Sequence, residues 1–337
     1  MKPAEQLRWF RRLSTLAAML AFCVVVLGAW VRLNDAGLGC PDWPGCYGHL
    51  SAGAAEQNLN AAQQLYPERR FEYSKAVKEM THRYVASTLG LLIIVLAVMA
   101  YRNRYAANQP VKVPLLLVPL VILQGLLGMW TVTLLLKPLI VTLHLLGGLT
   151  TLSLLTWQAI KIDRSTRPHA ERGLRKWAVI GLTVLGVQLF LGGWTSTNYA
   201  AVSCPDFPTC QAAYWPTMDA KDAFVLWRGL GIDYEGGVLT HPARVAIHFT
   251  HRIGALTTAI VLGWLAVATW RRGQTRAVQL AGLLVGLVLL TQLCVGPLMV
   301  LKGFPLWLAT VHNAVAALLL IAVVRLNRLL WVRRGLF

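Results

Sequence analysis

Four histidines recur at corresponding places in two halves of the chain. His82-Arg83 in the first half recurs as His251-Arg252 at an offset of 169, and His144 recurs as His312 at an offset of 168. Neutral imidazole is a good ligand for transition metals. Two histidines on facing helices can hold a metal or a cofactor in the core of a helix bundle. The sequence therefore predicts two sites, each built from a pair of histidines.

One residue distinguishes the two sites. Glu79 lies three residues before His82, so their side chains share a helix face. The corresponding position in the second half is His248. A carboxylate beside a bound ligand can accept a proton or stabilise developing positive charge. We therefore expect the first site to be reactive and the second to hold a cofactor. The alternative is that Glu79 only stabilises the start of its helix.

The elements that must position these residues are membrane-spanning helices. The 337 residues are 56% hydrophobic and 14% charged, whereas a soluble domain has about 25% charged residues. Eight apolar segments are long enough to cross a bilayer as helices and too continuous for barrel strands. They are 13–33, 78–100, 113–135, 139–160, 175–195, 245–270, 277–300 and 305–328. The predicted fold class is all-α integral membrane, with eight transmembrane helices surrounded by lipid.

The net charge of +18 is unevenly placed, which argues against nucleic acid as a partner. If the N-terminus is cytoplasmic, 20 of the 32 Lys and Arg residues and only three of the 14 acidic residues lie on the cytoplasmic side. This is the positive-inside pattern. It predicts a multi-pass protein with both termini in the cytoplasm and the four repeated histidines toward the outer face. His49, His169 and His241 fall in predicted loops.

The long outer loops repeat as well. Cys40 and Cys46 recur as Cys204 and Cys210 at an offset of 164. Close pairs on the oxidising side favour disulfides, with a zinc site as the alternative. Cys23 and Cys294 fall inside spans and are expected to be buried.

An even number of spans in each half gives parallel repeats, so we expect two pseudo-symmetric four-helix bundles. Residues 1–160 form the N-terminal bundle, 161–176 a cytoplasmic linker and 177–337 the C-terminal bundle.

Apart from His248, the predicted cores contain no histidines beyond these four, and they contain no carboxylate cluster. Haem iron held by two imidazoles is therefore the favoured ligand of each site. The alternative for a single histidine near a membrane interface is packing or hydrogen bonding, but four in register favour ligation. Arg83 and Arg252 could contact haem propionates, since guanidinium groups suit carboxylates. Their alternative is extension toward the membrane interface.

These residues together resemble the haem A synthase family, in its bacterial form. The resemblance covers essentially the whole chain: two related halves, Glu-x-x-His-Arg at 79–83, His144, His251-Arg252, His312 and the cysteine pairs. It implies an oxidoreductase of the bacterial cytoplasmic (inner) membrane. Such an enzyme oxidises the C8 methyl group of haem O to a formyl group, giving haem A for the assembly of terminal oxidases.

The resemblance also implies a role for each site residue. His251 and His312 would ligate the iron of a resident haem b, and His82 and His144 would hold the substrate, haem O. Glu79 would serve the chemistry. The pairs Cys40–Cys46 and Cys204–Cys210 would form disulfides, the first redox-active or structural. The implied partners are a haem O synthase as substrate donor and a haem-copper terminal oxidase under assembly, and a homo-oligomer stays open.

Two other classes of function stay open at this point. A di-haem b-type protein that passes electrons from quinol would explain the histidines, but not a carboxylate in one half only. A small-molecule transporter is compatible with parallel repeats and would contain no haem. Nothing in the predicted cores resembles the unwound ion site of such a transporter.

Overall fold

The computed structural model describes residues 3–160 and 172–331, and within these ranges the regular elements are all helical. Eight helices there are long and apolar enough to cross a membrane, which confirms the predicted all-α membrane class. They are α1 (Pro3–Leu33), α4 (Tyr73–Arg102), α5 (Lys112–Thr133), α6 (Pro138–Ala159), α7 (Arg172–Thr197), α9 (His241–Arg272), α10 (Arg276–Leu301) and α11 (Leu306–Leu330).

Several helices are longer than their apolar segments. Helix α4 begins at Tyr73 rather than at 78, and α9 begins at His241 rather than at 245. His241 is therefore helical, contrary to the loop expected from the sequence. Pro242 occupies the first turn of α9, where its missing N–H costs no helical hydrogen bond. Within the expected linker 161–176, residues 172–176 instead start α7, whereas 161–171, with His169, lie outside the described residues.

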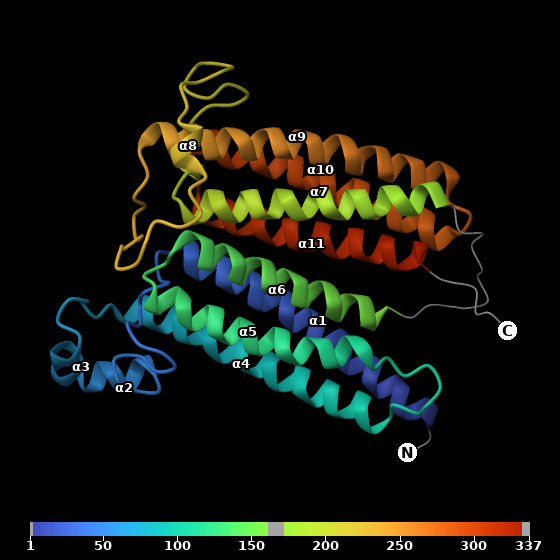
Figure 1. The fold of residues 1–337 in the computed structure, drawn as a ribbon, viewed down its shortest axis with the longest axis horizontal. Coiled ribbons are helices and arrows are strands. Elements are labelled where there is room, and N and C mark those ends of the chain that lie inside the picture. The colour runs from blue at the N-terminus through green and yellow to red at the C-terminus, as the bar shows by residue number, and fades with distance from the viewer. Residues whose placement is uncertain (1–2, 161–171, 332–337) are drawn as a thin grey trace.

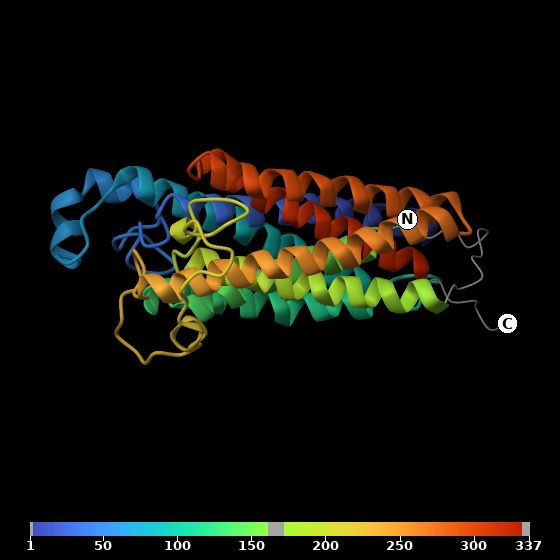
Figure 2. The same cartoon turned by 90° about the horizontal axis from the view of Figure 1, so that it is seen from above.

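The helices pack in two closed groups. Helices α1 and α5 each pack against α4 and α6, and helices α7 and α10 each pack against α9 and α11. Figure 1 shows the two groups one above the other, and Figure 2 shows them from above. Helix α11 also contacts α1 and α6, and α6 contacts α7. These contacts hold the groups together.

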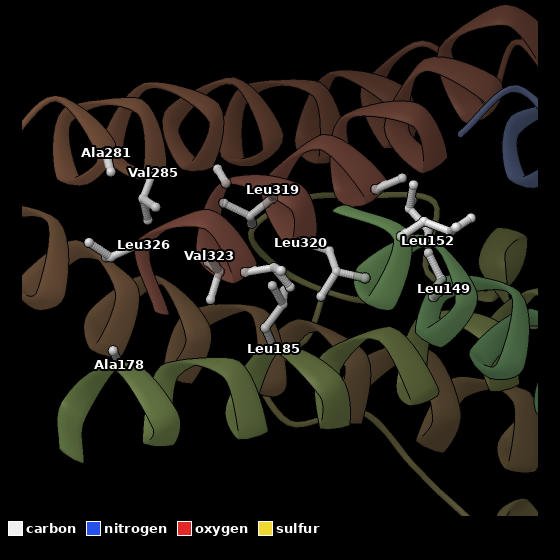
Figure 3. Packing of buried hydrophobic residues seen from close by; sticks show 14 of the residues in the cluster. Leu149, Leu152, Ala178, Leu185, Ala281, Val285, Leu319, Leu320, Val323 and Leu326 are labelled. Carbon is white, nitrogen blue, oxygen red and sulfur yellow. The ribbon is translucent and has the colours of Figure 1, made fainter. Parts of the chain in front are cut away.

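The core lies where the two groups meet. Leu320 and Val323 of α11 are almost fully buried, as are Leu152 of α6 and Leu185 of α7. Figure 3 shows these side chains converging from the three helices. In α11, half of the most apolar 18-residue stretch is buried, a larger share than in the other described membrane-spanning helices. Helix α11 is therefore the central packing element.

Two long loops lie at the end of the molecule opposite the start of α1 and the end of α11 (Figure 1). The first long loop (residues 34–72) contains two short helices, α2 (Ala52–Gln57) and α3 (Leu59–Leu65). The second long loop (residues 198–240) contains a short 3₁₀ helix, Ala201–Ser203, and α8 (Ala220–Ala223).

The second long loop is anchored on the first group of helices. Arg69 of the first long loop pairs with Asp233 at 2.5 Å and with Glu235 at 2.7 Å. Between these two acids, Tyr234 is buried, and its N–H donates to the carbonyl of Leu135 at 3.1 Å. The ammonium group of Lys137 donates to the carbonyl of Gly229 and lies 3.6 Å from the ring centre of Trp227. Residues 227–237 therefore form a strap that reaches across to the other half.

Replacing Arg69 with alanine is expected to loosen this strap. Both ion pairs are partly exposed, so their combined contribution is about 1 kcal/mol, roughly a fivefold rise in local opening. Hydrogen–deuterium exchange of peptides covering 227–237 measures it. The neighbouring Arg70→Ala, which removes an exposed guanidinium group, is the matched control. Equal exchange in the two variants would contradict the anchoring role.

Candidate functional site

The structure brings the four predicted histidines together in pairs. His82 on α4 and His144 on α6 lie close enough for one to act electrostatically on the other, and so do His251 on α9 and His312 on α11. Each ring is half-buried. In both groups, the pair comes from helices that each pack against the two remaining helices of the group.

Each histidine ring packs against a glycine of a neighbouring helix. A Cβ atom at Gly28 of α1 would lie 2.9 Å from Cε1 of His82, closer than side chains normally approach. The same contact recurs for Gly128 and His144 at 3.4 Å, for Gly192 and His251 at 3.2 Å, and for Gly296 and His312 at 3.3 Å. A bare backbone behind each imidazole therefore fixes where the ring can lie.

Sequence reasoning missed the role of these glycines. The available signal was the repeat: Gly28 recurs as Gly192 and Gly128 recurs as Gly296, with nearly the same offsets as the histidines. When a glycine and a histidine on two different helices both recur in the second half, the pattern indicates that the histidine ring packs against that glycine in each half.

The histidine pairs fit a haem better than a bare metal ion. Across 3–160 and 172–331, no three His, Cys, Asp or Glu side chains gather as ion ligands. A structural zinc site needs four ligands, whereas a bis-imidazole haem needs two. The buried Nδ1 atoms of His82 and His144 have no hydrogen-bond partner among the described residues. These two Nδ1 atoms are therefore not committed to a hydrogen bond within the described protein.

Glu79 is buried between α4 and the first long loop. It is 5% exposed. Its Oε1 pairs with Arg83 at 2.5 Å, and its Oε2 accepts a hydrogen bond from the N–H of Cys40 at 2.8 Å. Since α4 begins at Tyr73, Glu79 lies beyond the first turn and does not cap the helix. The carboxylate is held by one cation and one backbone donor.

Both arginines that follow the histidines hold a disulfide loop against their helix. Arg83 donates to the carbonyls of Asp42 at 2.9 Å and Gly45 at 2.5 Å. Arg252 donates to the carbonyls of Cys204, Asp206 and Thr209 at 2.7–3.0 Å. The structure thus gives both guanidinium groups a loop-binding role, and contact with propionates stays a prediction.

The two disulfide loops share one local structure. Disulfides join Cys40 to Cys46 and Cys204 to Cys210, so these sulfurs do not form the alternative zinc site. Asp42 accepts from the N–H groups of Tyr47 and Gly48, and Asp206 accepts from those of Gln211 and Ala212. The hydroxyl of Thr209 also donates a hydrogen bond to the carboxylate of Asp206, and this bond is the main reason that the pKa of Asp206 is lowered.

Two other cysteines lie differently from the prediction. Cys23 and Cys294 are free thiols and are exposed on the outside of the helices, where the sequence predicted buried positions. A small apolar side chain is equally compatible with a lipid-facing surface.

The second site lacks the carboxylate. His248, 5% exposed, occupies the place of Glu79, and its Nε2 lies 3.4 Å from Nε of Arg252. Its Nδ1 has no partner among the described residues. The second disulfide loop is therefore held by Arg252 without a helix carboxylate.

Fold and site define a multi-pass helical membrane protein with two imidazole pairs beneath two disulfide loops. A family model described as cytochrome oxidase assembly protein (COX15-CtaA) matches residues 11–324. The chain belongs to this family.

Three relatives carry the name heme A synthase. The protein of Shewanella oneidensis is 42% identical over 97% of both chains. That of Sphingopyxis alaskensis is 30% identical over 97% of this chain and 93% of its own. That of Halalkalibacterium halodurans is 24% identical over 90% of this chain and 91% of its own.

Replacing Gly39 with alanine should separate the first disulfide loop from α4. Its Cβ would lie 2.6 Å from the carbonyl carbon of Lys75, and a backbone atom cannot easily move away. Overpacking of this kind costs about 1–3 kcal/mol, and it would lower the thermal midpoint in detergent. Gly53→Ala in α2, where a Cβ meets no atom within 4 Å, is the control. Identical midpoints would show that the contact is unimportant.

Proposed function

We propose that this chain is a haem A synthase, an oxidoreductase that converts the C8 methyl group of haem O into a formyl group for cytochrome oxidase assembly. The observation that carries this proposal is the 42% identity with a heme A synthase over 97% of both chains. Membership of the cytochrome oxidase assembly family agrees with it. The proposed partners are a haem O synthase as donor and a haem-copper oxidase as recipient of the product.

The chain is proposed to be two pseudo-symmetric four-helix bundles, the first ending with α6 and the second beginning with α7 at Arg172 rather than at 177. Three observations support this: two closed groups of helices, two disulfide loops with the same hydrogen bonds, and four glycine–histidine contacts at matching offsets. The positive-inside charge pattern supports cytoplasmic termini and outward haem sites in a bacterial inner membrane.

The two histidine pairs are proposed to hold different haems. His251 and His312 ligate a resident haem b, and His82 and His144 hold the substrate haem O. The resident haem supplies one-electron redox chemistry when bound. The glycines of the neighbouring helices set the positions of the imidazole rings, so the two rings of each pair are already in place before a haem binds.

Glu79 is the proposed catalytic residue. It lies three residues from His82 on the same helix, and Arg83 and the N–H of Cys40 fix its carboxylate. A buried carboxylate in this position can accept a proton from the substrate methyl group or stabilise positive charge that develops on its carbon. The second pair, with His248 in this place, cannot do so in the same way.

Replacing Glu79 with glutamine tests the catalytic role. Glutamine keeps the shape and an acceptor for Cys40 but removes the charge. Haem A formation should fall by about 100-fold or more, measured by extracting haems from cells that also express a haem O synthase. Glu72→Gln, which changes an exposed carboxylate paired only with Lys75, should retain activity. Unchanged haem A formation in Glu79→Gln would remove Glu79 from the mechanism.

Replacing His251 with alanine tests the assignment of the resident haem. The purified variant should lose its haem b, because one of the two residues that would hold it is missing, whereas His82→Ala should retain it and lose haem O. Pyridine haemochrome spectra of purified protein measure both. Retention of haem b by His251→Ala contradicts the assignment. Haem b alone at both pairs of the unaltered protein would favour the di-haem electron carrier, and no haem at all the transporter.

A further inference from the structure

The imidazoles of the second half each lie against a glutamine amide. Nε2 of Gln188 on α7 is 3.1 Å from Nδ1 of His251 and 3.1 Å from its carbonyl oxygen. Nε2 of Gln292 on α10 is 3.3 Å and 3.2 Å from the two ring nitrogens of His312. Both rings of this pair therefore have a hydrogen-bonding side chain beside them.

The first half has no such contact among the described residues. Nδ1 of His82 and Nδ1 of His144 are buried without a partner. By the offset of 164, the place of Gln188 is occupied in the first half by Val24, which has no polar group to offer to His82.

Nε2 of Gln124, the counterpart of Gln292, has no hydrogen-bond partner among the described residues. The amide of Gln124 fills the space above Gly147, where no Cβ could fit beside it. By the offset of 168, Val315 stands in the place of Gly147 in the second half. The amide of Gln292 lies at the ring of His312, and the amide of Gln188 lies both over Gly254 and at the ring of His251.

Amide groups at this position suit a permanent ligand pair. A metal-bound histidine usually donates its other ring N–H to an acceptor, which fixes the tautomer and orientation of the ring and strengthens the ligand. Oε1 of Gln188 and Oε1 of Gln292 are buried and have no partner among the described residues. Since an amide offers an acceptor and a donor on one carbon, a turn about its last bond presents Oε1 to the ring. In Gln188 this turn gives up the hydrogen bond to the carbonyl of His251. In Gln124 the unpartnered atom is the donor, Nε2.

We propose that Gln188 and Gln292 are positioning residues that retain the haem of the second half, and that the first half, whose described histidine rings have no such hydrogen bonds, releases its haem. This inference rests on the proposed function, in which the second haem stays through many turnovers and the first must leave as product. On this proposal, retention of the haem depends on residues other than Glu79, which serves the reaction.

The test compares the rates at which haem leaves the purified holoprotein in detergent for an excess of apomyoglobin. Gln188→Val places the residue of the first half in the second, and Gln292→Leu removes the other amide. Each should release haem b about tenfold faster or more and alter the low-spin electron paramagnetic resonance signal of the bis-imidazole iron. Gln124→Leu, which removes an amide of the first half that has no hydrogen bond to a histidine ring among the described residues, is the control and should release haem b at the unaltered rate.

The reverse exchange tests the first half. Val24→Gln should slow the release of haem from the first pair in the same assay. Unaltered release and an unaltered spectrum in both Gln188→Val and Gln292→Leu would overturn the proposal. If Gln188→Val does not fold, Gln292→Leu and Val24→Gln decide the question between them. Failure of the proposed function is distinct, because it appears in the unaltered protein as an absence of haem A formation.

Discussion

Helices in lipid approach closely only where their facing residues are small, and in this protein that constraint sets the position of every predicted ligand. Four glycines on α1, α5, α7 and α10 leave bare backbone for four imidazoles on α4, α6, α9 and α11. The distance between the helix that carries each glycine and the helix that carries its histidine therefore fixes the position of the imidazole ring. The closed packing of four helices then brings the two rings of a pair together.

On this shared frame, the halves differ at a few polar positions. Both use an arginine to hold a disulfide loop against a helix, so the loops themselves do not distinguish the sites. Two pairs of corresponding positions distinguish them: Glu79 in the first half corresponds to His248 in the second, and Val24 corresponds to Gln188. The first difference adds a charge beside one ring, and the second removes a hydrogen bond from it. Under the proposed function, these two differences distinguish the site of reaction from the site that keeps its haem.

Much of this could be predicted from the sequence. Apolar length predicted the eight spans, and the repeat predicted which histidines would meet, because both signals act over many residues. The ends of α4 and α9 were misplaced because polar turns extend these helices beyond their apolar segments. The loop-binding role of Arg83 and the glutamine contacts were not predictable, since they depend on how a loop folds back and on which space a side chain finds free.

The strap formed by residues 227–237 has a mechanical consequence. Its acids are bound to Arg69 and its Gly229 carbonyl to Lys137, both in the first half, while its ends continue into the second. Any outward swing of the first long loop must break these bonds or pull the second long loop along. The strap therefore links the two long loops directly, in addition to the contacts between the helix groups in the core.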